Sequence, residues 1–451
     1  MNQIEATATK ERIAPKVPTF GEAFLFWVKL GFINFGGPTG QIAIMNTEIV
    51  EKRRWISQER FLHALNYCML LPGPEAQQLA IYIGWLLHRT WGGIVAGAFF
   101  VIPSIFILLF LSWIYAAYGN VPTVMAAFYG LKPAVTAIVA SATIQIGRRA
   151  LKNEVMYLIA FLAFVAIYFL RLPFPAIIVA AGLIGFLGGK LWPQKFYVIR
   201  PHGGEKEEAV ISDDFQSEHT RPSLRWAAKV IAVCVTLWVA PIIAVGLWRG
   251  TDDVFFQIGL FFSKAAMVTF GGAYAVLAYI AQAAVEQYGW LLPGQMLDGL
   301  GLAETTPGPL IMVTQFVGFL AAWQNVRDLS PLAAGIIGAL MTTWVTFTPC
   351  FLWIFLGAPF IERLRGNVVL TSALSAITAA VVGVVLNLAV FFSLHILFPS
   401  QGKILLAQLD WMALAITGVS FIGMLRWRWD IMIVVLVGAL VGLVYKWILG
   451  M

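Results

Sequence analysis

Long apolar stretches separated by short polar breaks run through most of this sequence. In the first half, four stretches reach the length of about 20 apolar residues that a helix needs to cross a bilayer. They cover residues 92–118, 121–147, 154–170 and 173–191, and the first of them contains no charged residue. Strands of a membrane β-barrel would show short segments that alternate between apolar and polar residues. The pattern therefore predicts an all-α, polytopic membrane protein.

Two earlier apolar segments are interrupted near their middle. Residues 20–34 and 38–51 flank a Phe-Gly-Gly break, and residues 61–71 and 75–87 flank a Pro-Gly-Pro break. Each arm, at about 11 to 15 residues, reaches only ~16–22 Å as a helix, which is short of a ~30 Å hydrocarbon core. We expect re-entrant hairpins that return to their own side of the membrane. Arms that cross in pairs are the alternative, and they would change the number of spans.

The same breaks recur in the second half of the chain. Phe35-Gly36-Gly37 and Pro72-Gly73-Pro74 are followed, 235 positions later, by Phe270-Gly271-Gly272 and Pro307-Gly308-Pro309. Beyond the breaks the match continues once about eleven residues are inserted. The chain is therefore predicted to be an internal duplication. Its predicted parts are a tail (1–19), a first transmembrane repeat (20–191), a polar cytoplasmic linker (192–225), a connecting transmembrane helix (226–250) and a second repeat (251–451).

Charged residues predict the orientation of the two repeats. With the N-terminus inside, Lys52-Arg53-Arg54 and Arg60 of the first repeat lie on the cytoplasmic side, as the positive-inside rule requires. The matched residues of the second repeat are Gln287-Tyr288-Gly289 and Gln295, which carry no charge. The single connecting helix delivers the second repeat to the other face of the membrane. The sequence therefore predicts two inverted-topology repeats, an arrangement typical of secondary transporters.

Composition agrees with a membrane protein and excludes several functions. Hydrophobic residues make up 60% of the chain and charged residues 12%, with a mean hydropathy of +0.81, whereas soluble chains carry about 25% charged residues. The formal charge of +7 comes from residues in short loops at span ends, so we expect no nucleic-acid partner. The three cysteines lack metal or redox spacing, and no nucleotide-binding fingerprint is present. We expect no enzyme, no ATP-driven pump, no metal and no cofactor.

The four breaks form the candidate substrate site. Irregular backbone within a membrane must line a cavity or be buried in protein, and the helix after each break exposes N–H donors and a partial positive charge. Helix N-termini of this kind bind anions, although glycine and proline also serve tight helix packing alone. The candidate residues, including neutral donors beside the breaks, are Gly36, Gly37, Pro38, Thr39, Gln41, Pro72, Gly73, Pro74, Gln77, Gln78, Gly271, Gly272, Thr306, Pro307, Gly308 and Pro309.

Two matched lysines and two glutamates complete the candidate residues. Lys29 and Lys264 precede the two Phe-Gly-Gly breaks, and a lysine within a membrane is by default a functional hypothesis. They would supply countercharge for a bound anion, with snorkelling to the interface as the alternative. Glu75 follows the first Pro-Gly-Pro and Glu304 precedes the second. Both are candidates for proton coupling, and Glu75 also suits the helix dipole as a plain helix-end residue.

The duplicated order of Phe-Gly-Gly, Trp and Pro-Gly-Pro resembles the chromate ion transporter family in its long, two-domain form. The resemblance covers roughly residues 20 to 397. It implies a prokaryotic, multi-pass inner-membrane protein that exports chromate, with two oppositely oriented domains and functional positions at both sets of breaks. Sulfate is the natural isostere of chromate. The second repeat departs from the pattern, because Ala273 replaces Pro38 and Met312 replaces Gln77, which puts the equivalence of the two sites in doubt.

We therefore expect a secondary transporter that exports chromate across the bacterial inner membrane, driven by an ion or voltage gradient. The expected partners are the oxyanion, with sulfate as the second option, and the lipid bilayer; a homodimer is one option for the assembly. Three alternatives stay open from the residues. They are uptake of sulfate or molybdate, an uncoupled anion channel, and a lipid-handling or membrane-enzyme scaffold.

Overall fold

The computed structural model describes residues 17–35, 37–197, 210–211, 223–270, 272–326, 328–360, 368–398 and 408–450. The described chain is helical throughout, apart from one isolated bridge between Ile56 and Ile211. Within it, seven helical stretches are long and apolar enough to cross a membrane. This confirms the all-α, multi-pass prediction. The stretches are Glu75–Tyr118, Pro122–Ala150, Phe174–Leu191, Leu224–Arg249, Pro331–Gly357, Val368–Leu397 and Ile431–Ile448.

The first half opens with short helices separated at the two motifs. Helix α1 (Phe20–Ile33) and helix α2 (Gly37–Met45) flank the Phe-Gly-Gly break, and α2 runs into a π-helical turn, η1 (Asn46–Lys52). Helix α3 (Gln58–Cys68) ends before Pro-Gly-Pro, and helix α4 (Glu75–Phe99) begins directly after it. Gly37 and Gly73 have φ values of +63° and +117°, which favour glycine over any L side chain. Both predicted breaks are therefore present.

Helix α4 reverses direction at its middle. His88 and Arg89 leave helical geometry, and Arg89 has a φ of +55°. Gln77 donates a hydrogen bond to the carbonyl of Gly97 at 3.1 Å, although a straight helix would separate these residues by about 30 Å. The chain therefore returns through the second arm of α4 and continues into helix α5 (Ile102–Tyr118). The predicted span 92–118 consists of that arm and α5, with a short break between them.

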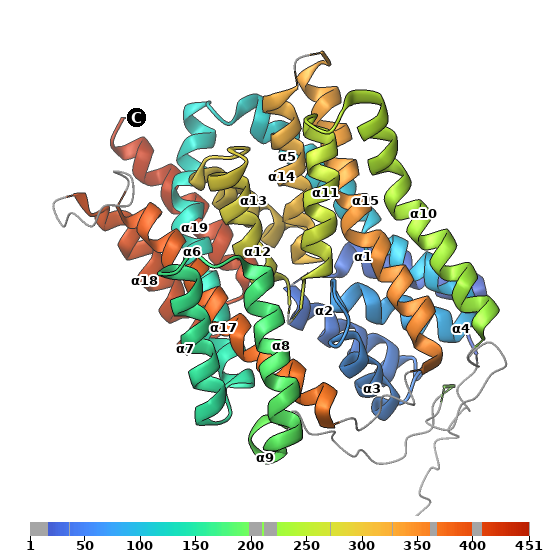
Figure 1. The fold of residues 1–451 in the computed structure, drawn as a ribbon. Helices are drawn as coiled ribbons and strands as arrows, with labels where there is room; N and C mark the ends of the chain where they lie inside the picture. Colours follow the sequence, from blue (N-terminus) through green and yellow to red (C-terminus); the bar gives the residue numbers. More distant parts are fainter. Residues whose placement is uncertain are drawn as a thin grey trace, which may run out of the picture.

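The second half repeats this order of elements. It contains helix α11 (Val254–Met267), helix α12 (Ala273–Gln282) with the π-helical turn η3 (Ala283–Gln287), and helix α13 (Pro293–Thr305). The turn η4 (Leu310–Met312), helix α14 (Val313–Asn325) and helix α15 (Pro331–Gly357) with the turn η5 (Ala358–Phe360) follow. Helix α10 (Leu224–Arg249) connects the halves and packs on α11 and α15. In Figure 1, α12 and α13 lie in the upper half of the molecule, and α2 and α3 in the lower half.

The last two helices of each half pack against a long helix of the other half. Helices α7 (Glu154–Tyr168) and α8 (Phe174–Leu191) of the first half pack on α17 (Val368–Leu397) of the second half. The short helix α9 (Pro193–Phe196) follows α8. In the same way, α18 (Trp411–Arg426) and α19 (Ile431–Ile448) pack on α6 (Pro122–Ala150) of the first half. Small residues allow these helices to approach closely: Gly185 lies against Ala376, and Gly442 lies against Gly130. The two halves are therefore interlocked along α6 and α17 (Figure 1).

Candidate functional site

The two halves join through their breaks in a reciprocal way. The N–H of Gly73 donates to the carbonyl of Thr269 at 2.8 Å, and the N–H of Gly308 donates to the carbonyl of Asn34 at 2.7 Å. Gly73 and Gly308 are matched positions of the duplication, and so are Asn34 and Thr269. Contacts exchanged in this manner are the pattern that a two-fold relation produces. Each Pro-Gly-Pro loop is thus held by the Phe-Gly-Gly break of the other half.

Side chains brace the same loops. Gln41 donates to the carbonyl of Gly308, and the hydroxyl of Ser104 donates to the carbonyl of Pro307. On the matched side, Gln78 donates to the carbonyl of Pro72 at 2.8 Å. The side-chain amides of Gln41 and Gln78 donate to backbone carbonyls of the loops, and these hydrogen bonds hold the loops in shape. The breaks are rigid connections between the halves, and they frame a cavity.

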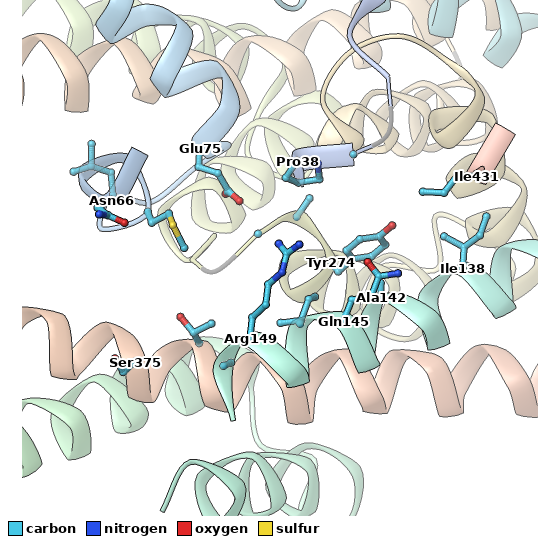
Figure 2. A pocket seen from close by; sticks show the side chains of 18 of the residues that line it. Pro38, Asn66, Glu75, Ile138, Ala142, Gln145, Arg149, Tyr274, Ser375 and Ile431 are labelled. Atoms are coloured by element: carbon cyan, nitrogen blue, oxygen red, sulfur yellow. The ribbon is translucent and has the colours of Figure 1, made fainter. Parts of the chain in front are cut away.

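This cavity has a volume of about 370 Å³ and receives residues from both halves (Figure 2). One wall comes from the Phe-Gly-Gly break of the first half and the residues that flank its Pro-Gly-Pro break, and another from the Phe-Gly-Gly break of the second half. The long helices α6 and α17 form the remaining sides, with α18 and α19 at the edge. The lining residues are Gly37, Pro38, Asn66, Met69, Leu71, Glu75, Ile138, Ala142, Gln145, Ile146, Arg149, Ala150, Gly272, Ala273, Tyr274, Ser375, Thr378, Met424 and Ile431.

Three charged or polar side chains dominate the cavity. Figure 2 shows the guanidinium of Arg149 rising from α6 between the carboxylate of Glu75 and the ring of Tyr274. Tyr274 is nearly buried, and its hydroxyl donates at 2.6 Å to Glu304, which lies behind it and is 4% exposed. The lining of the cavity therefore includes one cation and one carboxylate, and a second carboxylate is hydrogen-bonded to Tyr274.

Helix N-termini also converge on this cavity. Helix α2 begins at Gly37 and α12 at Ala273, after Gly272 with a φ of +103°, and both starts line the cavity. Helix α4 begins there at Glu75. The first N–H groups of a helix have no intrahelical partner and carry a partial positive charge. Together with Arg149, these termini form an arrangement that suits an anion.

Comparison with known proteins identifies the family. The model of the family described as "Chromate transporter" matches residues 21–186 and 256–443. The chain belongs to the chromate transporter family. A chromate transport protein of Pseudomonas aeruginosa is 31% identical over 385 residues, which cover 84% of this chain and 82% of the relative. One of Cupriavidus metallidurans is 27% identical and covers 81% of each chain, and an uncharacterised transporter of Methanocaldococcus jannaschii is 24% identical over 94% of each. No solved structure shows significant similarity to the chain.

This membership makes the chain a transporter and not an enzyme, as predicted. Among the described residues, no group of three or more His, Cys, Asp or Glu side chains could hold a metal ion.

The predicted site residues divide into two groups. Gly37, Pro38, Gly272 and Glu75 line the cavity. The other described candidates lie outside its lining, in the loops or buried beside them: Gln41, Pro72, Gly73, Pro74, Gln77, Gln78, Glu304, Thr306, Pro307, Gly308 and Pro309. Gly36, Gly271 and the side chain of Thr39 fall outside the described part of the structure.

The two lysines do not reach this cavity. Lys29 on α1 and Lys264 on α11 are exposed, and neither belongs to the lining. Lys29 lies near Glu48 of η1, which accepts a hydrogen bond from Lys52 at 2.6 Å. The structure therefore places neither matched lysine in the lining of the cavity that contains Arg149.

Arg149 is the cation that lines the cavity, and it was not among the predicted site residues. The predicted span 121–147 ended before Arg149, which lies in the last turn of α6. Ile138, Ala142, Gln145 and Arg149 follow one another at spacings of four, three and four residues and share one helix face. Polar residues on one face at the end of a long apolar helix were the available signal. Recognising it required the C-terminal boundary of α6 at Ala150.

Proposed function

We propose that this chain is a secondary transporter of chromate and that the anion occupies the cavity around Arg149. The observation that carries the proposal is the convergence of three helix N-termini, from both halves, on a cavity that contains one arginine. Relatives covering most of the chain are named chromate transport proteins. Guanidinium groups and helix N-termini are the protein groups best suited to tetrahedral oxyanions.

The size of the cavity fits this role. At ~30 Å³ of liquid volume per water molecule, about 370 Å³ holds roughly ten waters. A tetrahedral oxyanion therefore enters with part of its hydration shell, and the N–H groups and Arg149 replace the rest. Sulfate has the same charge and nearly the same size as chromate. We therefore expect sulfate to compete for the cavity, and transport of sulfate or molybdate is the second candidate function.

We further propose that the two repeats are inverted across the bacterial inner membrane. The reciprocal hydrogen bonds of Gly73 and Gly308 support a two-fold relation. The loss of basic residues in the second repeat supports opposite sidedness. With the first-repeat hairpins facing the cytoplasm, the cavity end at Arg149 and Ala150 also lies on the cytoplasmic side. A divalent anion leaving a negative-inside cell gains about 4.6 kcal/mol at 100 mV, which supports export.

The carboxylates supply a means of proton coupling. A divalent anion beside Arg149 repels the carboxylate of Glu75, which lines the same cavity. A proton on Glu75 removes this repulsion, and Tyr274 connects the cavity to Glu304. Coupled export in this form distinguishes a transporter from an uncoupled anion channel, because transport then depends on a pH gradient as well as on voltage.

The experiment is uptake of radiolabelled chromate by inside-out vesicles that contain the purified chain, with imposed pH and voltage gradients. We expect gradient-dependent uptake that excess sulfate reduces and that Arg149→Gln abolishes. Arg148→Gln is the matched control, because Arg148 is the adjacent arginine of α6 and lies outside the cavity lining. Uptake no greater than in empty vesicles would refute chromate transport. Equal losses in both variants would refute the role of Arg149.

A further inference from the structure

On the far side of the cavity, α13 is closed against α6 by a small polar cluster. Lys132 of α6 places its ammonium 3.3 Å from Oδ2 of Asp298 on α13, and the hydroxyl of Tyr115 donates to the same oxygen at 2.7 Å. Asp298 is 2% exposed, and its other oxygen, Oδ1, has no partner among the described residues. About one turn further along α13, Gly301 packs directly on Leu131.

The duplication predicts a matched contact in the first half. Helix α3 matches α13 at the offset of 235 positions, so His63 corresponds to Asp298 and Asn66 to Gly301. Helices α6 and α17 match at an offset of 246 positions. This offset pairs Gly130 with Ala376, and the two residues make matched contacts: Gly130 of α6 packs against α19, and Ala376 of α17 packs against α8. Lys132 then corresponds to Thr378. The contact matched to α13 on α6 is therefore α3 on α17.

In this structure the matched contact is open. Asn66 of α3 and Thr378 of α17 both line the cavity, whereas α13 packs closely on α6. In the described part of the chain, α3 packs on η1 and α4 and makes no comparable contact with α17. The cavity thus occupies the space that the matched contact would fill if the first half adopted the arrangement of the second.

We propose that Lys132, Asp298 and Tyr115 form a gate that closes the cavity on the extracellular side, and that α3 closes on α17 when this gate opens. The proposal rests on the proposed function, because it describes how the same cavity changes sides. A transporter built from two repeats changes its open side when the repeats exchange conformations. The present structure has the α13 contact closed and the α3 contact open.

The two gates are chemically unequal. Closing α13 forms an ion pair between the buried carboxylate of Asp298 and the partly exposed ammonium of Lys132, whereas closing α3 brings His63 and Asn66 toward Thr378 without a carboxylate. Removing the carboxylate takes away the charge that the ammonium of Lys132 pairs with in this contact. A neutral residue at position 298 therefore destabilises the closed α13 contact and shifts the chain toward the state that opens on the extracellular side.

The test measures access to single cysteines with a membrane-impermeant maleimide, in a chain whose three native cysteines are replaced. Val135 is fully buried and lies beside Gly301, so Val135→Cys reports on the α13 gate. Ala137→Cys is the matched control, since Ala137 is equally buried on α6 and lies two residues along the helix. Both are labelled from the extracellular side, with and without Asp298→Asn.

We expect Asp298→Asn to raise labelling of Val135→Cys about tenfold or more, because a minor state holds only ~0.1–10% of the population beforehand. Labelling of Ala137→Cys should stay unchanged. The exchanged pair Lys132→Asp with Asp298→Lys should return Val135→Cys to low labelling, which distinguishes a gate from a folding defect. Unchanged labelling of Val135→Cys in Asp298→Asn, or no recovery in the exchanged pair, overturns the proposal.

A second measurement tests the reciprocal movement. Asn66→Cys with Thr378→Cys should form a disulfide on oxidation, although the cavity separates the two positions here, and the crosslinked chain should label strongly at Val135→Cys. A crosslink without increased labelling, or no crosslink under any condition, overturns the coupled closure. Neither measurement uses chromate. If the labelling and crosslinking give the expected results but the chain does not transport chromate, the proposed substrate is refuted and the proposed gate is retained.

Discussion

Substitution of Gly308 tests the connection between the halves. Gly308 has a φ of +110°, and a Cβ at this position would overlap the hydroxyl of Ser104 and lie 2.9 Å from its Cβ. The backbone conformation costs an L side chain about 1–3 kcal/mol. Displacing Ser104 also breaks its hydrogen bond to Pro307, which contributes about 1 kcal/mol. Together Gly308→Ala should destabilise the folded chain by roughly 2–4 kcal/mol, or about 30- to 900-fold in the folding equilibrium.

The matched glycine should be less sensitive. Gly73 has a φ of +117°, but its Cβ would meet only the amide end of Gln78, at 2.9 Å, and the thiol of Cys350, at 3.0 Å. Both are side-chain ends that need to move only slightly, so Gly73→Ala carries the backbone strain and a smaller overlap, although the shift also weakens the hydrogen bond from Gln78 to Pro72. Gly418→Ala is the control, because Gly418 lies in α18 with nothing within 4 Å of its Cβ.

The assay is thermal unfolding in detergent, followed by tryptophan fluorescence, together with vesicle transport. We expect apparent melting temperatures in the order Gly418→Ala, Gly73→Ala, Gly308→Ala, from highest to lowest. Ser104→Ala added to Gly308→Ala should recover part of the loss, because it removes the overlapping hydroxyl. A Gly308→Ala chain that melts with the Gly418→Ala control would refute the reasoning from this loop.

Four further substitutions separate the roles of the charged residues and of Tyr274. Glu75→Gln should leave voltage-driven chromate transport but remove its dependence on an imposed pH gradient; a retained pH response would exclude Glu75 as the coupling group. Tyr274→Phe removes the hydroxyl that donates to Glu304 and should alter the pH profile of transport in a normally folded chain, whereas an unchanged profile would contradict a role for Glu304. Lys29→Gln and Lys264→Gln should each retain most transport, because both lysines lie outside the cavity, and a loss as large as that of Arg149→Gln would show that the site extends to them.

The helices and their breaks were predictable because they depend on local chemistry. Apolar runs define the spans, and breaks occur at the two motifs, where Gly37 and Gly73 adopt positive φ values that glycine accepts readily. The reversal of α4 at His88 and Arg89 falls between the predicted arm 75–87 and the predicted span 92–118, so its position was predictable from the apolar pattern. The close packing of the two arms on each other was not predictable from that pattern. It depends on tertiary packing, in which Gly84 and Gly92 let the two arms approach closely.

The candidate site was predictable only where the backbone defines it. The helix starts at Gly37 and Gly272 line the cavity, as the motifs indicated. The side chains that complete it come from α6 and α17, which are separated from the breaks by about a hundred residues. Their position depends on long-range packing, in which α7 and α8 pack on α17, and α18 and α19 pack on α6. No local sequence pattern encodes this packing. The polar face of α6 that carries Arg149 was therefore recognisable from residue spacing, but its place in the lining of the cavity was not.

Equilibrium binding of radiolabelled chromate to the purified chain tests the central claim most directly, because it needs neither orientation nor a gradient. We expect one saturable site per chain that sulfate displaces, that Arg148→Gln retains, and that Arg149→Gln loses by a factor of about 10 or more, since hydrogen bonds to charged groups contribute about 1.5–3 kcal/mol. Saturable binding that is equally strong in Arg149→Gln would show that the anion binds elsewhere and would contradict the account.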